Sequence, residues 1–245
     1  MIKSLVKTGL LTIATAALWA APAPSVAQTA APAATREEEP PSETAYKPPP
    51  RGAPGGRVGG ASRGTVKVTI PLPTIELLAP DGHTGLTTSA TPTLYFFVSR
   101  PIIWPTQFTI STPTQPNPIL EVNVPAPREA GVYSLRTADY HIRLEPGVLY
   151  IWSVSVILNP KARSRDVVAS ASLLRTAPDP ALETAPPSRR AALFAQAGLW
   201  YDAVAAAAET AALDHHVALD ALMNEVGLVE PARYDRQVAS GNRTR

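Results

Sequence analysis

Between Val66 and Leu174 the chain alternates short apolar runs with turn-forming segments. The runs are rich in β-branched and aromatic residues: VKVTI, TIELL, TLYFFV, QFTIS, ILEVNV, VYSLR, YHIRL, LYIWSVSVIL and VVASASLL. The segments between them, such as APDGHTG and TPTQPNP, carry proline, glycine, asparagine and aspartate. Short strands that recur at roughly ten-residue spacing are typical of an antiparallel sandwich rather than of strands alternating with helices. We therefore predict an antiparallel β-sandwich over residues 65–176.

The clearest of these strands is LYIWSVSVIL, at residues 149–158. Its bulky side chains fall on one face, which should enter the core: Tyr150, Trp152, Val154 and Val156. A turn at Pro146-Gly147 precedes it. A turn followed by Tyr-x-Trp-x-Val resembles immunoglobulin-like and fibronectin-type modules, a fold analogy that carries no function. The expected fold class is therefore α+β in two parts, of which the first is an immunoglobulin-like sandwich.

The second part follows a proline-rich connector at residues 177–187 and is helical. Three alanine-rich runs, RRAALFAQA, YDAVAAAAETAAL and HHVALDALMNEV, are separated or closed by Gly198 and Gly227, which are typical helix stops. The segment AGLWYDAVAAAAE resembles half of a tetratricopeptide-type repeat, but no second copy occurs at the repeat period. We predict a helical hairpin or three-helix segment at residues 188–229, resembling one such unit, and a flexible tail at 230–245.

The first 27 residues have the pattern of a secretory signal peptide. Lys3 and Lys7 precede an apolar run at residues 9–20, and small residues follow up to Ala27. The run is shorter than the roughly 20 residues that span a bilayer. We expect cleavage after Ala27, a periplasmic or secreted location, and no stable membrane insertion after cleavage.

Residues 28–64 carry seven prolines and six glycines and few large apolar side chains. Such a segment cannot bury enough surface to offset the entropy lost on ordering, so it is predicted to be a disordered linker.

Composition excludes several classes of function. Loss of Lys3 and Lys7 with the signal peptide leaves 20 basic and 20 acidic residues, so no basic surplus points to a nucleic-acid partner. The absence of cysteine excludes disulfides, thiolate metal sites and cysteine nucleophiles.

Short motifs give no catalytic, cofactor-binding or metal-ligating residues. Residues 60–64 match the G-x-S-x-G nucleophile pattern, but a linker precedes the match and a strand follows it. Asp139 and His141 could join a serine in a triad, yet no spacing supports one. His216 and Asp220 lie one helical turn apart, and two ligands are too few for a metal site.

Three blocks occur in order along the chain: TPTLYFFV (residues 91–98), YIWSVSVILNPKARSRDVVASASLLR (150–175) and RAALFAQAGLWYDAVAAAAE (190–209). With these blocks the chain resembles the family catalogued as domain of unknown function 928, found in exported proteins of cyanobacteria and other bacteria. The resemblance covers roughly Arg63 to Gly227, and its most specific element is G-x-W-Y-D-A. The family often has a cysteine before its P-x-x-R-S turn, where this chain has Leu158-Asn159. The resemblance implies an exported two-part protein without an assigned activity or functional residue.

Our leading hypothesis is an exported, non-enzymatic interaction or structural module of the bacterial cell envelope, with no cofactor. Its partner would be another envelope or secreted protein, held at a sheet edge or at the helical hairpin. Trp104, Trp200 and Tyr201 are the candidate contact residues. Exposed together they would mark an interface, whereas buried they belong to the core.

Two alternatives remain open at this point. A hydrolase of cell-wall or extracellular polymer would need carboxylates such as Asp166, Asp202 or Glu209 to converge at the junction of the two parts. A carbohydrate-binding protein would need Trp104 or Trp200 exposed as a stacking surface.

Overall fold

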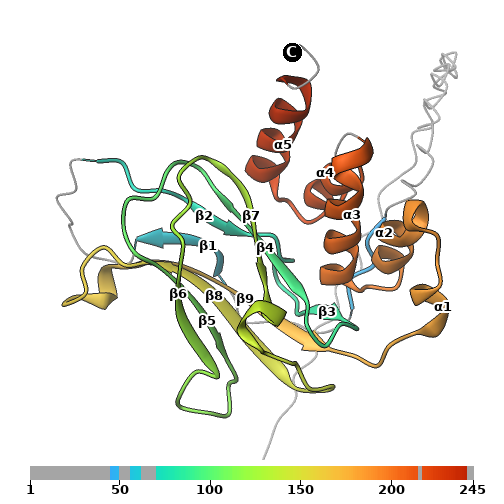
Figure 1. Ribbon diagram of the computed structural model, residues 1–245, viewed down its shortest axis with the longest axis horizontal. Helices are drawn as coiled ribbons and strands as arrows, with labels where there is room; N and C mark the ends of the chain where they lie inside the picture. Colours follow the sequence, from blue (N-terminus) through green and yellow to red (C-terminus); the bar gives the residue numbers. More distant parts are fainter. Residues whose placement is uncertain (1–44, 50–55, 62–69, 215–216, 242–245) are drawn as a thin grey trace, which may run out of the picture. The chain divides into compact units, whose positions relative to one another are not determined.

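Nine strands in the described part of the chain form two sheets that are joined through one strand (Figure 1). The computed structural model describes residues 45–49, 56–61, 70–214 and 217–241, all within the unit Pro41–Arg245. The strands are β1 (Gly56–Ala61), β2 (Ile75–Leu77), β3 (Gly85–Thr87), β4 (Thr93–Val98), β5 (Thr106–Ser111), β6 (Leu120–Val124), β7 (Gly131–Arg136), β8 (Leu149–Val156) and β9 (Val167–Arg175). One sheet has the order β6-β5-β8-β9, the other has β2-β4-β7, and β1 pairs with both β9 and β2.

The β8–β9 ladder is antiparallel over eight pairs, from Leu149↔Leu174 to Val156↔Val167. Tyr150, Trp152 and Val154 are buried while the residues between them are less so, which confirms the predicted inward face of this strand. Strand β3, however, runs parallel to β9, with Gly85 opposite Leu173. The sheet that contains β9 is therefore mixed, whereas the pairs of β2, β4 and β7 are all antiparallel. Strands β1 and β3 share one edge of β9: β1 pairs with its first half and β3 with its end.

The predicted strand YHIRL is instead a turn. Residues Thr137–Tyr140 form a single 3-10 turn, and His141 takes the left-handed conformation with φ 57°. The Thr137 hydroxyl donates to the carbonyl oxygen of Pro92 (3.0 Å), which anchors the turn to the segment before β4. Tyr140 packs on Phe108 with ring centroids 5.6 Å apart. Its ring therefore packs against the core from this turn and not from a strand.

Strand β1 lies inside the segment predicted to be a disordered linker, and the structure differs from the prediction there. Gly59 pairs with Ile75, and a Cβ at Gly59 would lie 3.0 Å from the backbone of Val168. The glycines that suggest disorder in the sequence thus permit the close approach of two backbones. Most of the linker, the predicted signal peptide and most of the run VKVTI lie outside the described residues.

Five helices form the second part in the described residues: α1 (Pro180–Glu183), α2 (Pro187–Gln196), α3 (Trp200–Asp214), α4 (Val217–Glu225) and α5 (Val229–Gly241). Helix α1 lies in the predicted connector, where the Asp179 side chain accepts a hydrogen bond from the Ala181 amide (2.9 Å) and caps it. Helix α5 lies where the sequence predicted a flexible tail. Its Tyr234 packs on Phe97 of β4 with ring centroids 5.5 Å apart, and this contact holds the helix on the sheet. Gly198 separates α2 from α3 with φ 75°, as the sequence predicts.

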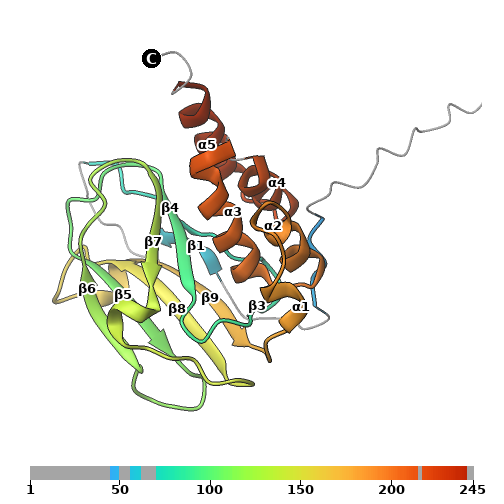
Figure 2. The ribbon, with the colours of Figure 1, turned by 45° about the vertical axis from the view of Figure 1, so that its right-hand side comes forward.

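The helices pack on the sheets rather than standing apart from them (Figure 2). Helix α3 contacts β3 and β4, α2 packs along α3, and α5 contacts β7. One buried apolar cluster includes Trp152 of β8 as well as Trp200 and Leu222 of the helices. No helix in the described part of the chain is both long enough and apolar enough to cross a membrane.

Candidate functional site

The first turn of α3 inserts two aromatic side chains between the sheets and the helices. Trp200 is 0% exposed and its Nε1 donates to the carbonyl oxygen of Leu78 (2.9 Å). Tyr201 is 2% exposed, and its hydroxyl donates to the carbonyl oxygen of Ser172 (2.9 Å) while accepting from Trp152 Nε1 (2.9 Å). These rings join α3 to β8, β9 and the segment after β2.

The assignment of Trp200 and Tyr201 as partner contacts is therefore wrong, because neither ring reaches the surface. Their side chains bury apolar area and satisfy their own polar atoms, which is the behaviour of core residues. Trp104 lies elsewhere, half-buried in the loop before β5 and packed against the core. The three residues do not form a common surface.

Asp202, the next residue on α3, connects the helix to the last residue of β3 and to the residue after it. Its carboxylate accepts hydrogen bonds from the Thr87 hydroxyl (2.7 Å), the Thr88 amide (2.7 Å) and the Thr88 hydroxyl (3.1 Å). Burial raises the pKa of this carboxyl above its usual 3.8, and the hydrogen bonds from Thr87 and Thr88 oppose that shift. Both oxygens are occupied, so Asp202 acts as a structural link.

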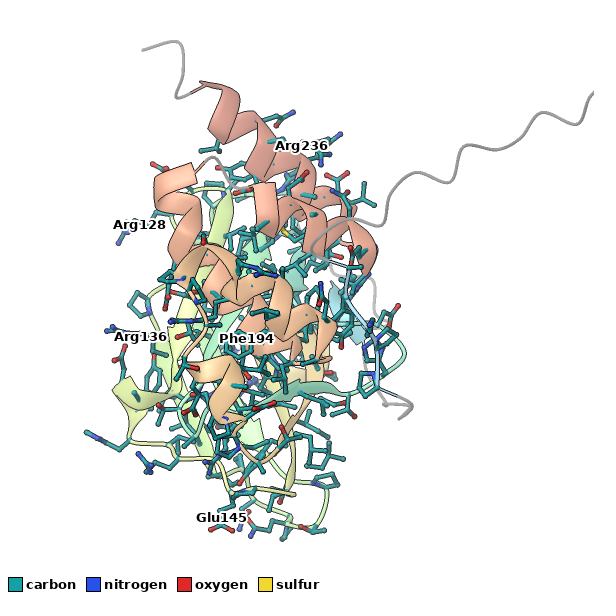
Figure 3. All side chains as sticks on the ribbon, turned by 90° about the vertical axis from the view of Figure 1, so that its right-hand side faces the viewer. Arg128, Arg136, Glu145, Phe194 and Arg236 are labelled. Atoms are coloured by element: carbon teal, nitrogen blue, oxygen red, sulfur yellow. The ribbon has the colours of Figure 1, made fainter. Side chains whose placement is uncertain are left out.

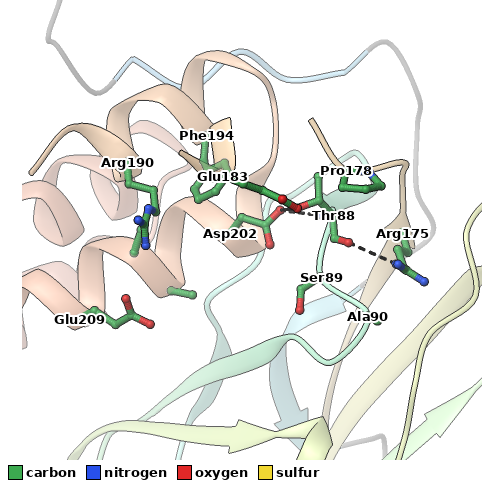
Figure 4. Close-up of a pocket in the computed structure, with 12 residues that line it drawn as sticks. Thr88, Ser89, Ala90, Arg175, Pro178, Glu183, Arg190, Phe194, Asp202 and Glu209 are labelled. Atoms are coloured by element: carbon green, nitrogen blue, oxygen red, sulfur yellow. Dashed lines mark hydrogen bonds between the residues drawn. The ribbon is translucent and has the colours of Figure 1, made fainter. Parts of the chain in front are cut away.

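A pocket of about 460 Å³ opens beside Asp202 (Figure 4). Five elements contribute its lining: the segment after β3, the end of β9 with the residues after it, and the helices α1, α2 and α3. The lining residues are Thr88, Ser89, Ala90, Arg175, Pro178, Glu183, Arg190, Phe194, Asp202, Ala205, Ala206 and Glu209. Figure 3 views the molecule from this helical side, with Phe194 of α2 labelled near its centre. Side chains of both charges thus line a single cavity.

The two arginines of the pocket are held by carbonyl oxygens and not by carboxylates. Arg175 donates from Nε to Thr88 (3.2 Å) and from Nη1 to Leu144 (2.9 Å), so it links β9 to two loops. Arg190 donates only from Nη2, to Ala185 (3.1 Å), and its buried Nε has no hydrogen-bond partner. Neither guanidinium forms an ion pair within the described part of the chain, although three carboxylates line the same pocket.

The three carboxylates that the sequence singles out do not all converge. Asp202 and Glu209 both line the pocket, two turns apart on α3. Asp166 is separate: it is 3% exposed and accepts from Arg163 Nε (2.5 Å) in the turn before β9. Arg175 and Arg190 were not predicted, because no spacing along the chain connects them to each other or to Asp202.

Of the two histidines in the described part of the chain, His83 takes part in a cluster that the sequence did not suggest. Tyr46, in the described segment 45–49, stacks on His83 with ring centroids 5.6 Å apart, and its hydroxyl lies 2.9 Å from His83 Nε2. Tyr46 also packs edge-on against Trp200 at 5.0 Å, and the Lys47 amide donates to the carbonyl oxygen of Ala195 (3.1 Å). Segment 45–49 therefore packs on the first residue of α3 and on the end of α2, and none of its residues lines the pocket.

The remaining motif residues carry no site. His141 occupies the turn before β8, and the described part of the chain holds no group of three His, Cys, Asp or Glu residues placed to bind a metal. His215, His216 and residues 62–64 of the G-x-S-x-G match lie outside the described residues.

Comparison with known proteins gives one match. The sequence model of the family described as Domain of Unknown Function (DUF928) matches residues 58–234, which is more than half of the chain. No curated protein and no solved structure matches.

Proposed function

Because the chain belongs to the family described as Domain of Unknown Function (DUF928), whose description assigns no activity, we propose a function from the pocket itself. The protein is a non-enzymatic interaction module of the bacterial cell envelope, and it binds a partner protein at the pocket beside Asp202. Export would follow from the signal-peptide pattern at residues 1–27.

The observation that carries this proposal is the different state of the charged groups in the pocket. Asp202, the most buried of the three lining carboxylates, already accepts three hydrogen bonds from Thr87 and Thr88. A general acid or base must exchange a proton with its substrate, and the hydrogen bonds that Asp202 already accepts hinder that exchange. Arg190 has one hydrogen bond among its five N–H donors. A pocket whose most buried carboxylate is already hydrogen-bonded, and in which Arg190 keeps most of its donors available, suits recognition better than catalysis.

The finer features of the fold belong to the same proposal. We propose that the two sheets are an immunoglobulin-like sandwich, and that α2 and α3 act as a single tetratricopeptide-type hairpin. In this arrangement the hairpin does not offer its own groove, because one repeat cannot form one. It supports the pocket instead, since α2 and α3 supply six of the lining residues.

Site-specific photo-cross-linking tests the proposal. A photo-reactive amino acid replaces Glu209, which is exposed at the pocket, and in a control chain it replaces Asn224, which is exposed on α4. Cells producing each full chain are irradiated, and covalent products are identified by mass spectrometry. We expect a discrete partner product from position 209 that is absent from position 224.

A paired substitution shows whether that product depends on the pocket. Arg190→Met removes the guanidinium and keeps an unbranched apolar stem, whereas Arg189→Met makes the same charge change at the neighbouring exposed residue. The product should disappear in the first variant and persist in the second. Equal products from positions 209 and 224, unaffected by either variant, would contradict the proposal.

A hydrolase is the second candidate, and one observation favours it. Asp202 and Glu209 line the same pocket, and burial raises the pKa of Asp202, as a general acid requires. Release of soluble sugars or peptides from peptidoglycan or extracellular polysaccharide, abolished by both Asp202→Asn and Glu209→Gln, would establish it. A carbohydrate-binding role has less support, because Trp200 is buried and only Trp104 is left to stack on a sugar.

A further inference from the structure

Among the charged side chains that line the pocket, the guanidinium of Arg190 is the one with a buried polar atom that has no hydrogen-bond partner in the described part of the chain. It is fixed by one hydrogen bond to Ala185, which leaves Nη1 without a hydrogen bond and Nε buried without an acceptor. A buried donor without a partner costs free energy, so native structures keep few of them. Arg175 differs, because two of its nitrogens are already bound to carbonyl oxygens.

Nothing inside the pocket competes for Arg190. Asp202 is occupied by Thr87 and Thr88, and neither Glu183 nor Glu209 forms an ion pair with it. Figure 4 shows the Arg190 side chain extending from α2 on the same side of the pocket as Glu209, with Arg175 on the opposite side of the view. A ligand that enters here meets a free cation beside a free carboxylate.

We propose that Arg190 binds the carboxylate of an acidic side chain on the partner polypeptide, and that Glu209 receives a basic side chain close to it. This inference rests on the proposed function and adds the chemistry of the partner. A carboxylate can bind a guanidinium through two parallel hydrogen bonds, and such charge-assisted bonds are about twice as strong as neutral ones. At the edge of Arg190 formed by Nε and Nη2 it would supply the acceptor that Nε lacks, beside the hydrogen bond that Nη2 donates to Ala185.

The rest of the lining suits a polypeptide better than a polysaccharide. Ala90, Pro178, Ala205 and Ala206 add small apolar side chains to the lining, and these can contact aliphatic side chains of a partner. Phe194 is the one aromatic residue of the lining and is only 8% exposed, so it offers no face on which a sugar ring could stack. The pocket therefore combines a cation, an anion and alkyl surface.

Nuclear magnetic resonance titration of the full chain tests the inference with defined probes. The reference probe is the capped peptide acetyl-Ala-Glu-Ala-Lys-amide, and two matched peptides replace Glu or Lys by Gln. Glucuronic acid supplies a sugar carboxylate, and inorganic phosphate supplies a simple anion. The signals followed are the side-chain Nε–H of Arg190 and the backbone amide of Ala205, both at the pocket.

We expect the reference peptide to shift both signals saturably at millimolar concentration. Replacing Glu by Gln should weaken binding about tenfold or more, and replacing Lys by Gln should weaken it less. The Arg190→Met variant should lose the Ala205 shift, and Arg189→Met should retain it. Binding of the Glu and Gln peptides with equal affinity, or equal shifts in both variants, would overturn the inference, as would tighter binding of glucuronic acid or phosphate than of the reference peptide.

This experiment can fail separately from the proposed function. If the peptides do not bind while the cross-link from position 209 forms and depends on Arg190, the partner role stands and the carboxylate chemistry is wrong. If the reference peptide binds as expected but no cross-link forms from position 209, the carboxylate site stands and the partner-protein role is wrong.

Discussion

Two sides of helix α3 use polar side chains in opposite ways. On the buried side, the ring nitrogen of Trp200 and the hydroxyl of Tyr201 both have hydrogen-bond partners at 2.9 Å. On the pocket side, Arg190 of the neighbouring helix has one partner and a buried Nε with none. Satisfied groups hold the helices on the sheets, whereas the unsatisfied group marks where a ligand can add something. Trp200 and Tyr201 thus stabilise the fold, whereas Arg190 is available to a ligand at the pocket.

The largest expected effect is from truncating the buried side. Trp200→Ala should lower the free energy of unfolding by about 4 kcal/mol, because it empties a fully buried site and leaves the Leu78 carbonyl without its donor. Urea denaturation followed by circular dichroism measures this. Trp104→Ala is the matched control and should cost clearly less, since that indole is only half-buried. Equal losses in the two variants would show that Trp200 is not part of the junction.

A smaller change on the buried side of α3 removes only the hydroxyl oxygen of Tyr201. Tyr201→Phe should cost about 2 kcal/mol, because Trp152 Nε1 loses its buried acceptor. Tyr133→Phe removes a hydroxyl that donates to the Glu129 carbonyl near the surface (3.0 Å) and should cost well under half as much. Similar unfolding free energies for wild type and Tyr201→Phe would show that the hydrogen bonds of the Tyr201 hydroxyl do not stabilise the buried side of α3.

Asp202 lies between the two sides, and its titration gives a pH-dependent prediction. Burial raises its pKa in the folded protein above 3.8, so the folded state binds more protons than the unfolded state in that window. Wild type should therefore lose stability relative to Asp202→Asn as pH rises from about 3.8 through the raised pKa. Urea denaturation of both proteins between about pH 3 and 7 measures the difference. If wild type gains relative stability over that range, the hydrogen bonds from Thr87 and Thr88 outweigh burial.

The smallest expected effect on stability is at the pocket. Arg190→Met should change the free energy of unfolding by about 1 kcal/mol or less, because the stem remains and the buried Nε without a partner is removed along with one hydrogen bond. Arg189→Met is the control for the charge change. A loss of about 3 kcal/mol or more in Arg190→Met alone, of the size found for breaking buried charge networks, would make Arg190 a structural residue like Asp202.

Periodicity within one element was enough to predict part of this fold. The alternation in β8 correctly gave its buried face, and Gly198 correctly marked the end of α2. Strand β1 was missed because the glycines that permit its contact with β9 also look like a linker. Helix α5 was missed because its apolar residues are few and gain their partner, Phe97, only from a distant strand.

The candidate site was less predictable for a related reason. Trp200 and Tyr201 suit an interface or a core equally well in sequence. Only their contacts in the folded chain decide between the two: Trp200 binds Leu78 after β2, and Tyr201 binds β8 and β9. Asp202 and Glu209 lie on the same predicted helix, so their spacing in the sequence is enough to predict that they lie on one face of it. Arg190 belongs to another helix, and what distinguishes it, a missing hydrogen-bond partner, is a property of the folded structure alone.

The most direct test of the account is the yield of the cross-link from position 209, compared between Arg190→Met and Arg189→Met chains of equal stability. Both variants remove one positive charge from neighbouring positions of α2, and only Arg190 lines the pocket. We expect the partner product to be lost in Arg190→Met and retained in Arg189→Met. Equal yields in the two variants would contradict the claim that the pocket arginine is there for binding.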